Sequence, residues 1–156
     1  MEIKDRFDLS ITAASREAVD HYIVGLDLLL SANTGAEERF ARAIDIDPEF
    51  ALAHIAYARL LQLQARMPEA RRAATRARAL GSRLSIRERQ HVEAIAFAIE
   101  GAATQALAIV RTHASEYPRD ALPLSLALGV FGLLGFSGRL DHHADASLER
   151  IRGCYA

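Results

Sequence analysis

The chain has no tryptophan and only one cysteine, one lysine and four prolines among its 156 residues. A single cysteine, Cys154, excludes an internal disulfide and favours a reducing compartment, so we expect a cytoplasmic protein. The net charge of −1 provides no overall attraction to nucleic acid or to a membrane surface. The longest apolar stretch, 122–136, is interrupted by Ser125 and by glycines and is too short to span a bilayer. The chain is instead rich in alanine and leucine, and this composition favours a core of packed helices.

A segment rich in alanine, residues 51–80, is the most informative part of the sequence. Two apolar-periodic stretches are separated by Met67-Pro68, and small residues recur at Ala58, Ala70, Ala74 and Ala77. Small side chains at helical spacing let two helices cross closely. The segment therefore predicts a helix–turn–helix pair of about 34 residues, which must stack on neighbouring pairs to bury its apolar face.

The same pattern recurs on both sides of this segment. Pro48 and Pro118 each close a unit, and Ala36, Phe40 and Ala43 repeat the small–aromatic–small spacing. We expect an N-terminal extension over 1–14 and units over about 15–48, 49–84, 85–118 and 119–156, with a two-residue insertion in the loop from Leu80 to Leu84. No strand alternation is visible. The predicted fold is all-α, a right-handed superhelical stack of about eight helices.

Capping signals support these helix boundaries. Thr34 with Glu37, and Ser85 with Glu88, have the spacing of capping boxes. Pro48 and Pro68 are expected at the first helical position, where a missing N–H has no cost. Gly101, Gly135 and Gly138 are expected in turns.

The chain resembles tetratricopeptide repeat proteins, and in particular the N-terminal part of the tetratricopeptide repeat protein 38 family. The resemblance rests on residues 9–18, on 43–54 with Pro48, Phe50 and His54, and most specifically on the stretch Arg87-Glu88-Arg89-Gln90-His91-Val92. Two departures are a Leu128-Gly129 pair where the family tends to have His-Asp, and an end at Ala156 where the family continues with further repeats. The resemblance implies a repeat scaffold and no reaction.

In this architecture the first helix of each unit lines a concave groove. The expected groove is mostly apolar and suits a helical or extended apolar segment of a protein partner of unknown identity. Its predicted residues are Leu52, Ile55, Arg59, Leu63, Glu88, His91, Ile95, Ile99, Leu122 and Leu133. The main prediction is therefore a non-catalytic protein-interaction scaffold without cofactor or metal. The C-terminal helices, with Leu148, Ile151 and Tyr155, could also join two copies in a homodimer.

A basic segment gives the alternative function. Residues 59–89 contain nine arginines and two glutamates, and Arg71, Arg72, Arg76 and Arg78 form its centre within the Arg66–Arg89 patch. Such a patch can bind phosphates of a nucleic acid or an anionic surface. No aromatic residues interleave with the arginines to stack on bases, so a solvated or ion-paired face is the preferred interpretation.

Two clusters could carry chemistry. On a helix, His142, Asp145 and Glu149 share one face beside His143, a spacing that could hold a metal, and Cys154 lies nearby. His91, with Glu88 and Glu93, could resemble an acid–base group, but no nucleophile is spaced for it. We interpret the first cluster as a solvated face and the second as structural, with an enzyme or metal protein as a third hypothesis.

Overall fold

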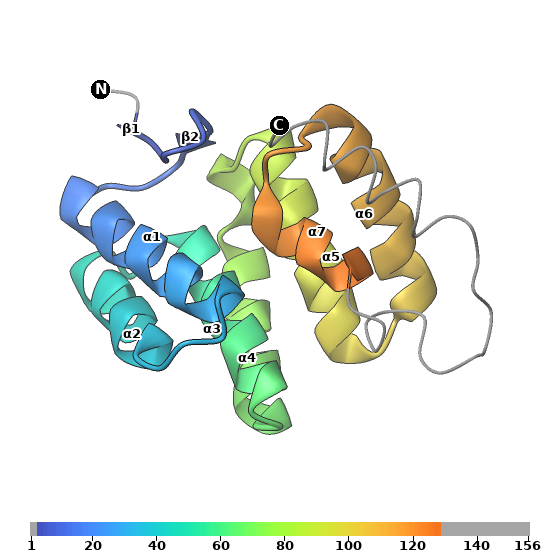
Figure 1. The fold of residues 1–156 in the computed structure, drawn as a ribbon, viewed down its shortest axis with the longest axis horizontal. Coiled ribbons are helices and arrows are strands. Elements are labelled where there is room, and N and C mark those ends of the chain that lie inside the picture. The colour runs from blue at the N-terminus through green and yellow to red at the C-terminus, as the bar shows by residue number, and fades with distance from the viewer. Residues whose placement is uncertain (1–2, 129–156) are drawn as a thin grey trace.

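The structure of the chain is a computed structural model that describes residues 3–128. The described helices are α1 (Arg16–Leu30), α2 (Ala36–Ile46), α3 (Ala51–Leu63), α4 (Met67–Ala79), α5 (Ile86–Glu100), α6 (Ala103–Glu116) and α7 (Ala121–Leu128). Figure 1 shows α1 to α6 following one another along the molecule, with α7 folded back over α5. The predicted all-α class is confirmed. The expected eighth helix, over 139–152, and the predicted turns at Gly135 and Gly138 lie outside the described residues.

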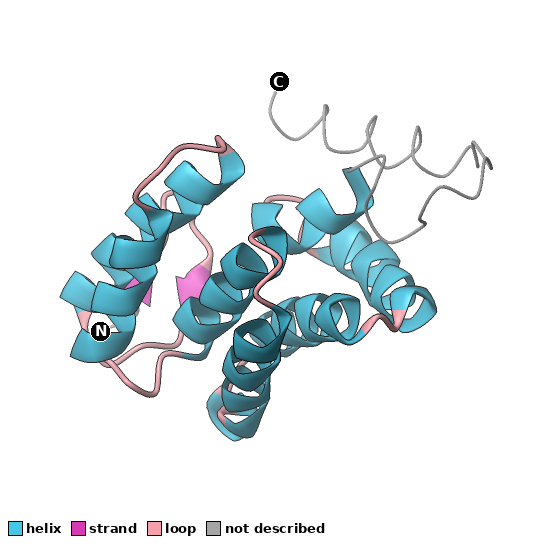
Figure 2. Ribbon diagram, turned by 90° about the horizontal axis from the view of Figure 1, so that it is seen from below, coloured by secondary structure: helices cyan, strands magenta, loops and turns pink. Residues whose placement is uncertain are grey.

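Consecutive helices pack in pairs, α1 with α2, α3 with α4 and α5 with α6, and α3 and α4 both contact α5 (Figures 1 and 2). Small residues lie where the helices of a pair meet. Ala58, Ala70, Ala74 and Ala77 are buried in the second pair. In the first pair, a Cβ atom at Gly25 would lie 2.7 Å from Cε1 of the buried Phe40. These contacts explain the alanine-rich pattern, since larger side chains would force the helices apart.

The corners that end α1, α3 and α5 share one geometry. Each has a residue with positive φ, namely Ala32 at 55°, Ala65 at 60° and Gly101 at 80°. In each corner the following N–H donates to a carbonyl five residues earlier: Asn33 to Leu28 at 2.8 Å, Arg66 to Leu61 at 2.9 Å and Ala102 to Phe97 at 2.9 Å. This is the Schellman motif, which satisfies the carbonyls left free at a helix end.

These corners give the repeat its register. The positive-φ residues are 33 and then 36 residues apart, close to the expected period of about 34. The longer interval contains a 3₁₀ turn, η1 (Gly81–Arg83), in the loop where the insertion was expected. Leu30, Leu63 and Ile99 therefore occupy equivalent positions, each two residues before its corner residue.

Pro48 and Pro118 lie in equivalent turns rather than at the first position of a helix. The N–H of Phe50 donates to Asp47 O at 3.0 Å, and the N–H of Asp120 donates to Tyr117 O at 3.1 Å, so each proline is the second residue of a four-residue turn. The prediction that Pro48 begins a helix is wrong because α3 starts at Ala51. Pro68, by contrast, lies in the first turn of α4 as expected.

One of the two predicted capping boxes is present. Ser85 accepts from the N–H of Glu88, and the Glu88 carboxylate accepts from the N–H of Ser85, so this box is confirmed. The box at Thr34 is wrong, because Gly35 with φ 94° is the residue before α2 and no side chain caps that helix. The carboxylate of Glu37 instead accepts from Arg66 Nη1 at 2.8 Å.

Residues 3–14, which we call the N-terminal arm, contain the strand structure that the sequence did not indicate. Strands β1 (Ile3–Lys4) and β2 (Ser10–Ile11) pair antiparallel, with Ile3 opposite Ile11. The turn between them is held by Asp5 Oδ1, which accepts from the N–H groups of Phe7 at 2.8 Å and Leu9 at 3.0 Å. Two-residue strands show too little alternation to be read from a sequence. Ile3 and Ile11 are buried and join the core.

Candidate functional site

Most of the expected groove residues are core residues in this structure. Leu52, Ile55, Glu88, His91, Ile95, Ile99 and Leu122 are all buried. Arg59 is partly buried, Leu63 is exposed, and Leu133 lies outside the described residues. The concave face is therefore not open along its full length, which corrects the expectation that all of these side chains face a partner.

The chain itself covers this face. Helix α7 contacts α1 as well as α5 and α6, so the fourth unit returns across the first helix of the first unit. The N-terminal arm meets the same end of α5, where Arg87 donates both to Ser10 O at 2.6 Å and to Asp120, the residue before α7. The arm and the start of α7 therefore cover the N-terminal end of α5.

The opposite ends of α1 and α3 stay open. Leu30 is 40% exposed and Leu63 is 59% exposed, and both occupy the equivalent corner position defined above. The third equivalent residue, Ile99, is buried. We give the name C-terminal lip of the groove to Leu30 together with Leu63 and the partly buried Arg59, which lies one turn before Leu63 on α3.

Arg59 has an unusual environment on this lip. Its Nη1 donates to Gln62 Oε1 at 2.5 Å, and Gln62 Nε2 donates onward to Ala98 O at 3.2 Å, which links α3 to α5. No carboxylate among residues 3–128 forms an ion pair with it. Burial without a compensating acid lowers the pKa of the Arg59 guanidinium. A carboxylate from outside the described residues would therefore find a strong partner here.

The basic patch is partly neutralised within the chain. Arg66 pairs with Glu37 at 2.8 Å and also with Glu69, and Arg78 pairs with Glu93 at 2.9 Å and also with Glu100. The acidic first unit thus contributes a partner from the same molecule. The central residues Arg71, Arg72 and Arg76 are exposed. Of these, Arg76 makes a long contact of 3.4 Å to Pro48 O.

A buried polar cluster joins α5, α6 and the start of α7. The carboxylate of Asp120 accepts from Arg87 Nη1 at 2.5 Å and lies 2.9 Å from His91 Nδ1. His113 Nε2 is 3.2 Å from Asp120 Oδ2, but without hydrogen-bond alignment, and its Nδ1 lies 2.9 Å from Gln90 Oε1. All three partners of Asp120 are themselves buried.

The charged contacts of this cluster stabilise the ionised form of Asp120. Burial alone would raise the pKa of Asp120, but the charge of His91, the contacts from His113 and His91, and the Arg87 guanidinium hold it well below its ordinary range. Asp120, His91 and His113 are almost inaccessible to solvent. The structural interpretation of His91 fits this geometry.

Sequence reasoning missed Asp120 and His113 as members of the cluster. His113 was visible as a misfit, since it stands where the repeat pattern expects a small residue. A polar residue at a core position of a repeat usually has a buried polar partner. That signal could have been followed to Asp120, which begins the next unit.

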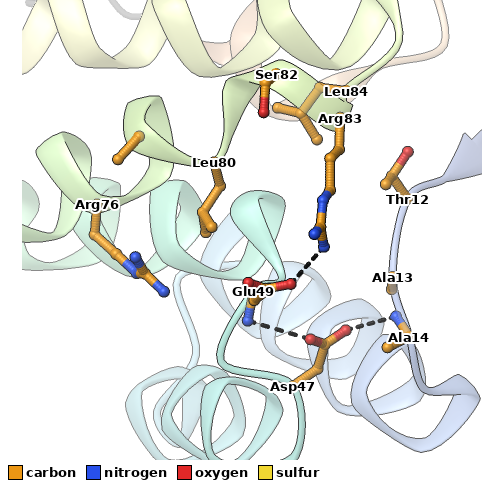
Figure 3. Close-up of a pocket in the computed structure, with 11 residues that line it drawn as sticks. Thr12, Ala13, Ala14, Asp47, Glu49, Arg76, Leu80, Ser82, Arg83 and Leu84 are labelled. Carbon is orange, nitrogen blue, oxygen red and sulfur yellow. Dashed lines mark hydrogen bonds and ion pairs between the residues drawn. The ribbon is translucent and has the colours of Figure 1, made fainter.

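A cleft of about 500 Å³ opens beside the arm. Figure 3 shows Thr12, Ala13 and Ala14 along one side, with Arg76 and Leu80 of the α4 end opposite. Arg83 Nη1 donates to Glu49 Oε2 at 2.6 Å within it, and both side chains of this pair are largely exposed. Other lining residues are Asp47, Ala79, Ser82 and Leu84.

Residues 3–128 contain no group of histidine, cysteine and acidic side chains arranged to hold a metal ion. His142, His143, Asp145, Glu149 and Cys154, which carried the metal hypothesis, lie outside this range, as do Leu148, Ile151 and Tyr155. Within the described part of the chain, every helix is too short or too polar to cross a membrane.

Comparison of the chain with protein-family models, with curated proteins and with solved structures returns no match. The resemblance to the tetratricopeptide repeat protein 38 family therefore stays a prediction.

Proposed function

We propose that this protein is a non-catalytic, cytoplasmic interaction scaffold that binds a segment of a protein partner at the C-terminal lip. The main observation is that Leu30 and Leu63, at equivalent corners of consecutive units, are both exposed, and that Arg59 lies one turn before Leu63 on α3. Exposed large apolar side chains at equivalent repeat positions favour a protein-binding surface.

The lip also suggests the chemistry of the partner. Leu30 and Leu63 would pack against apolar side chains, while Arg59 would pair with a carboxylate. A helical or extended segment with an acidic residue next to apolar ones meets both needs. The absence of an acidic partner for Arg59 within residues 3–128 supports this choice.

The proposal that the protein is not an enzyme draws support from the buried cluster. Its titratable groups contact one another and have almost no solvent exposure. The Arg66–Arg89 patch gives weaker support to nucleic-acid binding, because Arg66 and Arg78 already pair with glutamates of the same chain. A nucleic-acid shift assay over a range of salt concentrations tests that alternative, which requires a steep loss of affinity with salt.

The test of the lip uses charge substitutions and a matched control. Leu63→Asp, alone and with Leu30→Asp, should abolish retention of specific proteins from a cell extract, measured by quantitative mass spectrometry against the wild-type chain. Ile86→Asp is the control, since Ile86 is 60% exposed, apolar and remote from the lip in the repeat, at the first turn of α5. Circular dichroism must show all variants folded. Equal loss in the Ile86 variant, or unchanged retention in the Leu63 variant, would contradict the proposal.

A further inference from the structure

The N-terminal arm is bound by the helical stack as an extended peptide would be. Arg87 Nη2 donates to the carbonyl of Ser10 at 2.6 Å. Glu88 Oε1 accepts from the N–H of Thr12 at 2.6 Å, and Asp47 Oδ2 accepts from the N–H of Ala14 at 2.7 Å. Main-chain groups of residues 10, 12 and 14 thus face three charged side chains. This spacing of two residues is the period of an extended strand.

The three side chains are built into the stack as a binding site, which we call the peptide clamp. Asp47, Arg87 and Glu88 are buried in this structure. Each is anchored to the stack by a second contact: Asp47 accepts from the N–H of Glu49 at 3.2 Å, Arg87 donates to Asp120, and Glu88 closes the capping box with Ser85. Charge-assisted hydrogen bonds from anchored groups are stronger and more selective than neutral ones on mobile side chains.

The clamp has sequence preferences as well as main-chain contacts. Thr12 Oγ1 donates to Glu88 Oε2 at 2.8 Å, so a hydroxyl residue is preferred at that position. Ile11, the residue before it, is buried, so an apolar side chain is preferred there. The N–H groups at the positions of Thr12 and Ala14 exclude proline from both. The ligand class is an extended segment with an apolar residue followed by serine or threonine and two small residues.

Alternate side chains of the bound segment are accessible to solvent. Ser10, Thr12 and Ala14 are exposed. Residues 12–14 border the cleft of about 500 Å³ (Figure 3), and the N–H of Ala14 points toward Asp47. Among arm residues, only Ile3 and Ile11 are buried. The other buried core residues come from the helices and their connecting turns, so a released arm exposes Ile3 and Ile11, and exchange must bury both side chains again on the second copy.

We propose that the peptide clamp exchanges its own arm for the arm of a second copy of this chain. The second arm is the segment known to carry every required group, and exchange forms the same contacts between copies that exist within one copy. The site is separate from the C-terminal lip, since it uses the N-terminal turn of α5 and the turn before α3. It holds or fails independently of the proposed function.

The first test uses the full-length chain with Thr12→Pro. This substitution removes both the N–H and the hydroxyl that donate hydrogen bonds to Glu88. The probe is a fluorescein-labelled synthetic peptide of residues 7–15, followed by fluorescence anisotropy. We expect the peptide to bind the Thr12→Pro chain at least about tenfold more tightly than the wild-type chain, whose own arm competes. The same peptide with Thr12→Pro is the matched control and should not bind. No saturable binding of the native peptide to the folded variant overturns the proposal.

The second test measures exchange between copies. Light scattering after size exclusion, over a range of wild-type concentrations, should show a dimer that grows with concentration, and the Thr12→Pro chain should stay monomeric. A dimer equally abundant in both chains places the contact elsewhere and overturns arm exchange, as does a wild-type chain that stays monomeric at all concentrations. If Thr12→Pro fails to fold, Thr12→Val replaces it, because it keeps the N–H and loses only the hydroxyl contact. The Thr12→Val chain should then bind the native peptide more tightly than the wild type does, and an equal affinity refutes the clamp.

Discussion

A comparison of the stabilities of Gly101→Ala and Gly81→Ala measures the free-energy cost of a left-handed backbone conformation at a repeat corner. At both positions an added Cβ would meet no atom within 4 Å, so neither substitution creates a clash. Gly101 has φ 80°, whereas Gly81, in the 3₁₀ turn η1, has no positive φ. The two substitutions therefore differ mainly in whether the backbone conformation suits an alanine.

The magnitude follows from two opposing terms. A left-handed conformation costs an L-residue roughly 1–2 kcal/mol. Replacing glycine by alanine also lowers the entropy of the unfolded chain, which stabilises the fold by about 0.4–1 kcal/mol where the backbone is compatible. Gly81→Ala should therefore raise the free energy of unfolding by about 0.5 kcal/mol. Gly101→Ala should lower it by about 0.5–1 kcal/mol, so the variants should differ by about 1–1.5 kcal/mol.

The assay is urea unfolding followed by circular dichroism, with thermal unfolding as a second measurement. A difference of about 1.5 kcal/mol corresponds to roughly 3–6 °C in Tm for a chain of this size. The reverse substitutions, Ala32→Gly and Ala65→Gly, should each stabilise the protein by up to about 1 kcal/mol, because both alanines have positive φ. Equal stabilities of Gly101→Ala and Gly81→Ala would refute the argument that a common strained corner defines the repeat.

Three further predictions concern the core. Gly25→Ala should destabilise the protein by about 1 kcal/mol or more, measured by urea unfolding, because its Cβ would lie 2.7 Å from the buried Phe40 ring, an overlap that outweighs the gain in helix propensity. Asp120→Asn should cost about 3 kcal/mol in the same measurement, because it leaves Arg87 buried without its carboxylate partner; a change below about 1 kcal/mol would contradict this role. The folded-state pKa of Asp120 is depressed, so its stabilisation is fully present above the unfolded-state pKa of about 3.9 and is lost as the pH falls below that value. Urea titrations between pH 6 and pH 3 should therefore show a steeper loss for the wild type than for Asp120→Asn, and parallel profiles would exclude this contribution.

The local features of the fold were predictable where their causes are local. The capping box at Ser85 needs only two side chains three residues apart, and the corner at Gly101 needs only a residue that tolerates positive φ. The box at Thr34 is absent because Gly35 is the residue before α2, and Glu37 instead accepts from Arg66 of the next helix pair. The corners at Ala32 and Ala65 carry no glycine, so their conformation was not visible in the sequence.

The candidate site was less predictable than the fold. Of the residues expected in the groove, Leu63 is exposed, whereas Ile55, Ile95 and Ile99 are buried. Repeat register assigns a side chain to the concave face without indicating whether that face is covered. Leu30 was not among the expected groove residues. The shared corner geometry shows that it occupies the position in its unit that Leu63 occupies in the next.

The sequence by itself determined an all-α chain of helix pairs, because apolar periodicity, small residues at crossings, proline turns and caps act over a few residues. Only the tertiary structure decided which surfaces remain open. Thr12 and Glu88 are 76 residues apart, and α1 meets α7 across the whole described chain. Such contacts depend on how the whole stack curves, and this curvature is the combined result of small packing differences at every helix pair. Local patterns therefore predicted the helices, while the closed groove, the open lip and the peptide clamp emerged from long-range packing.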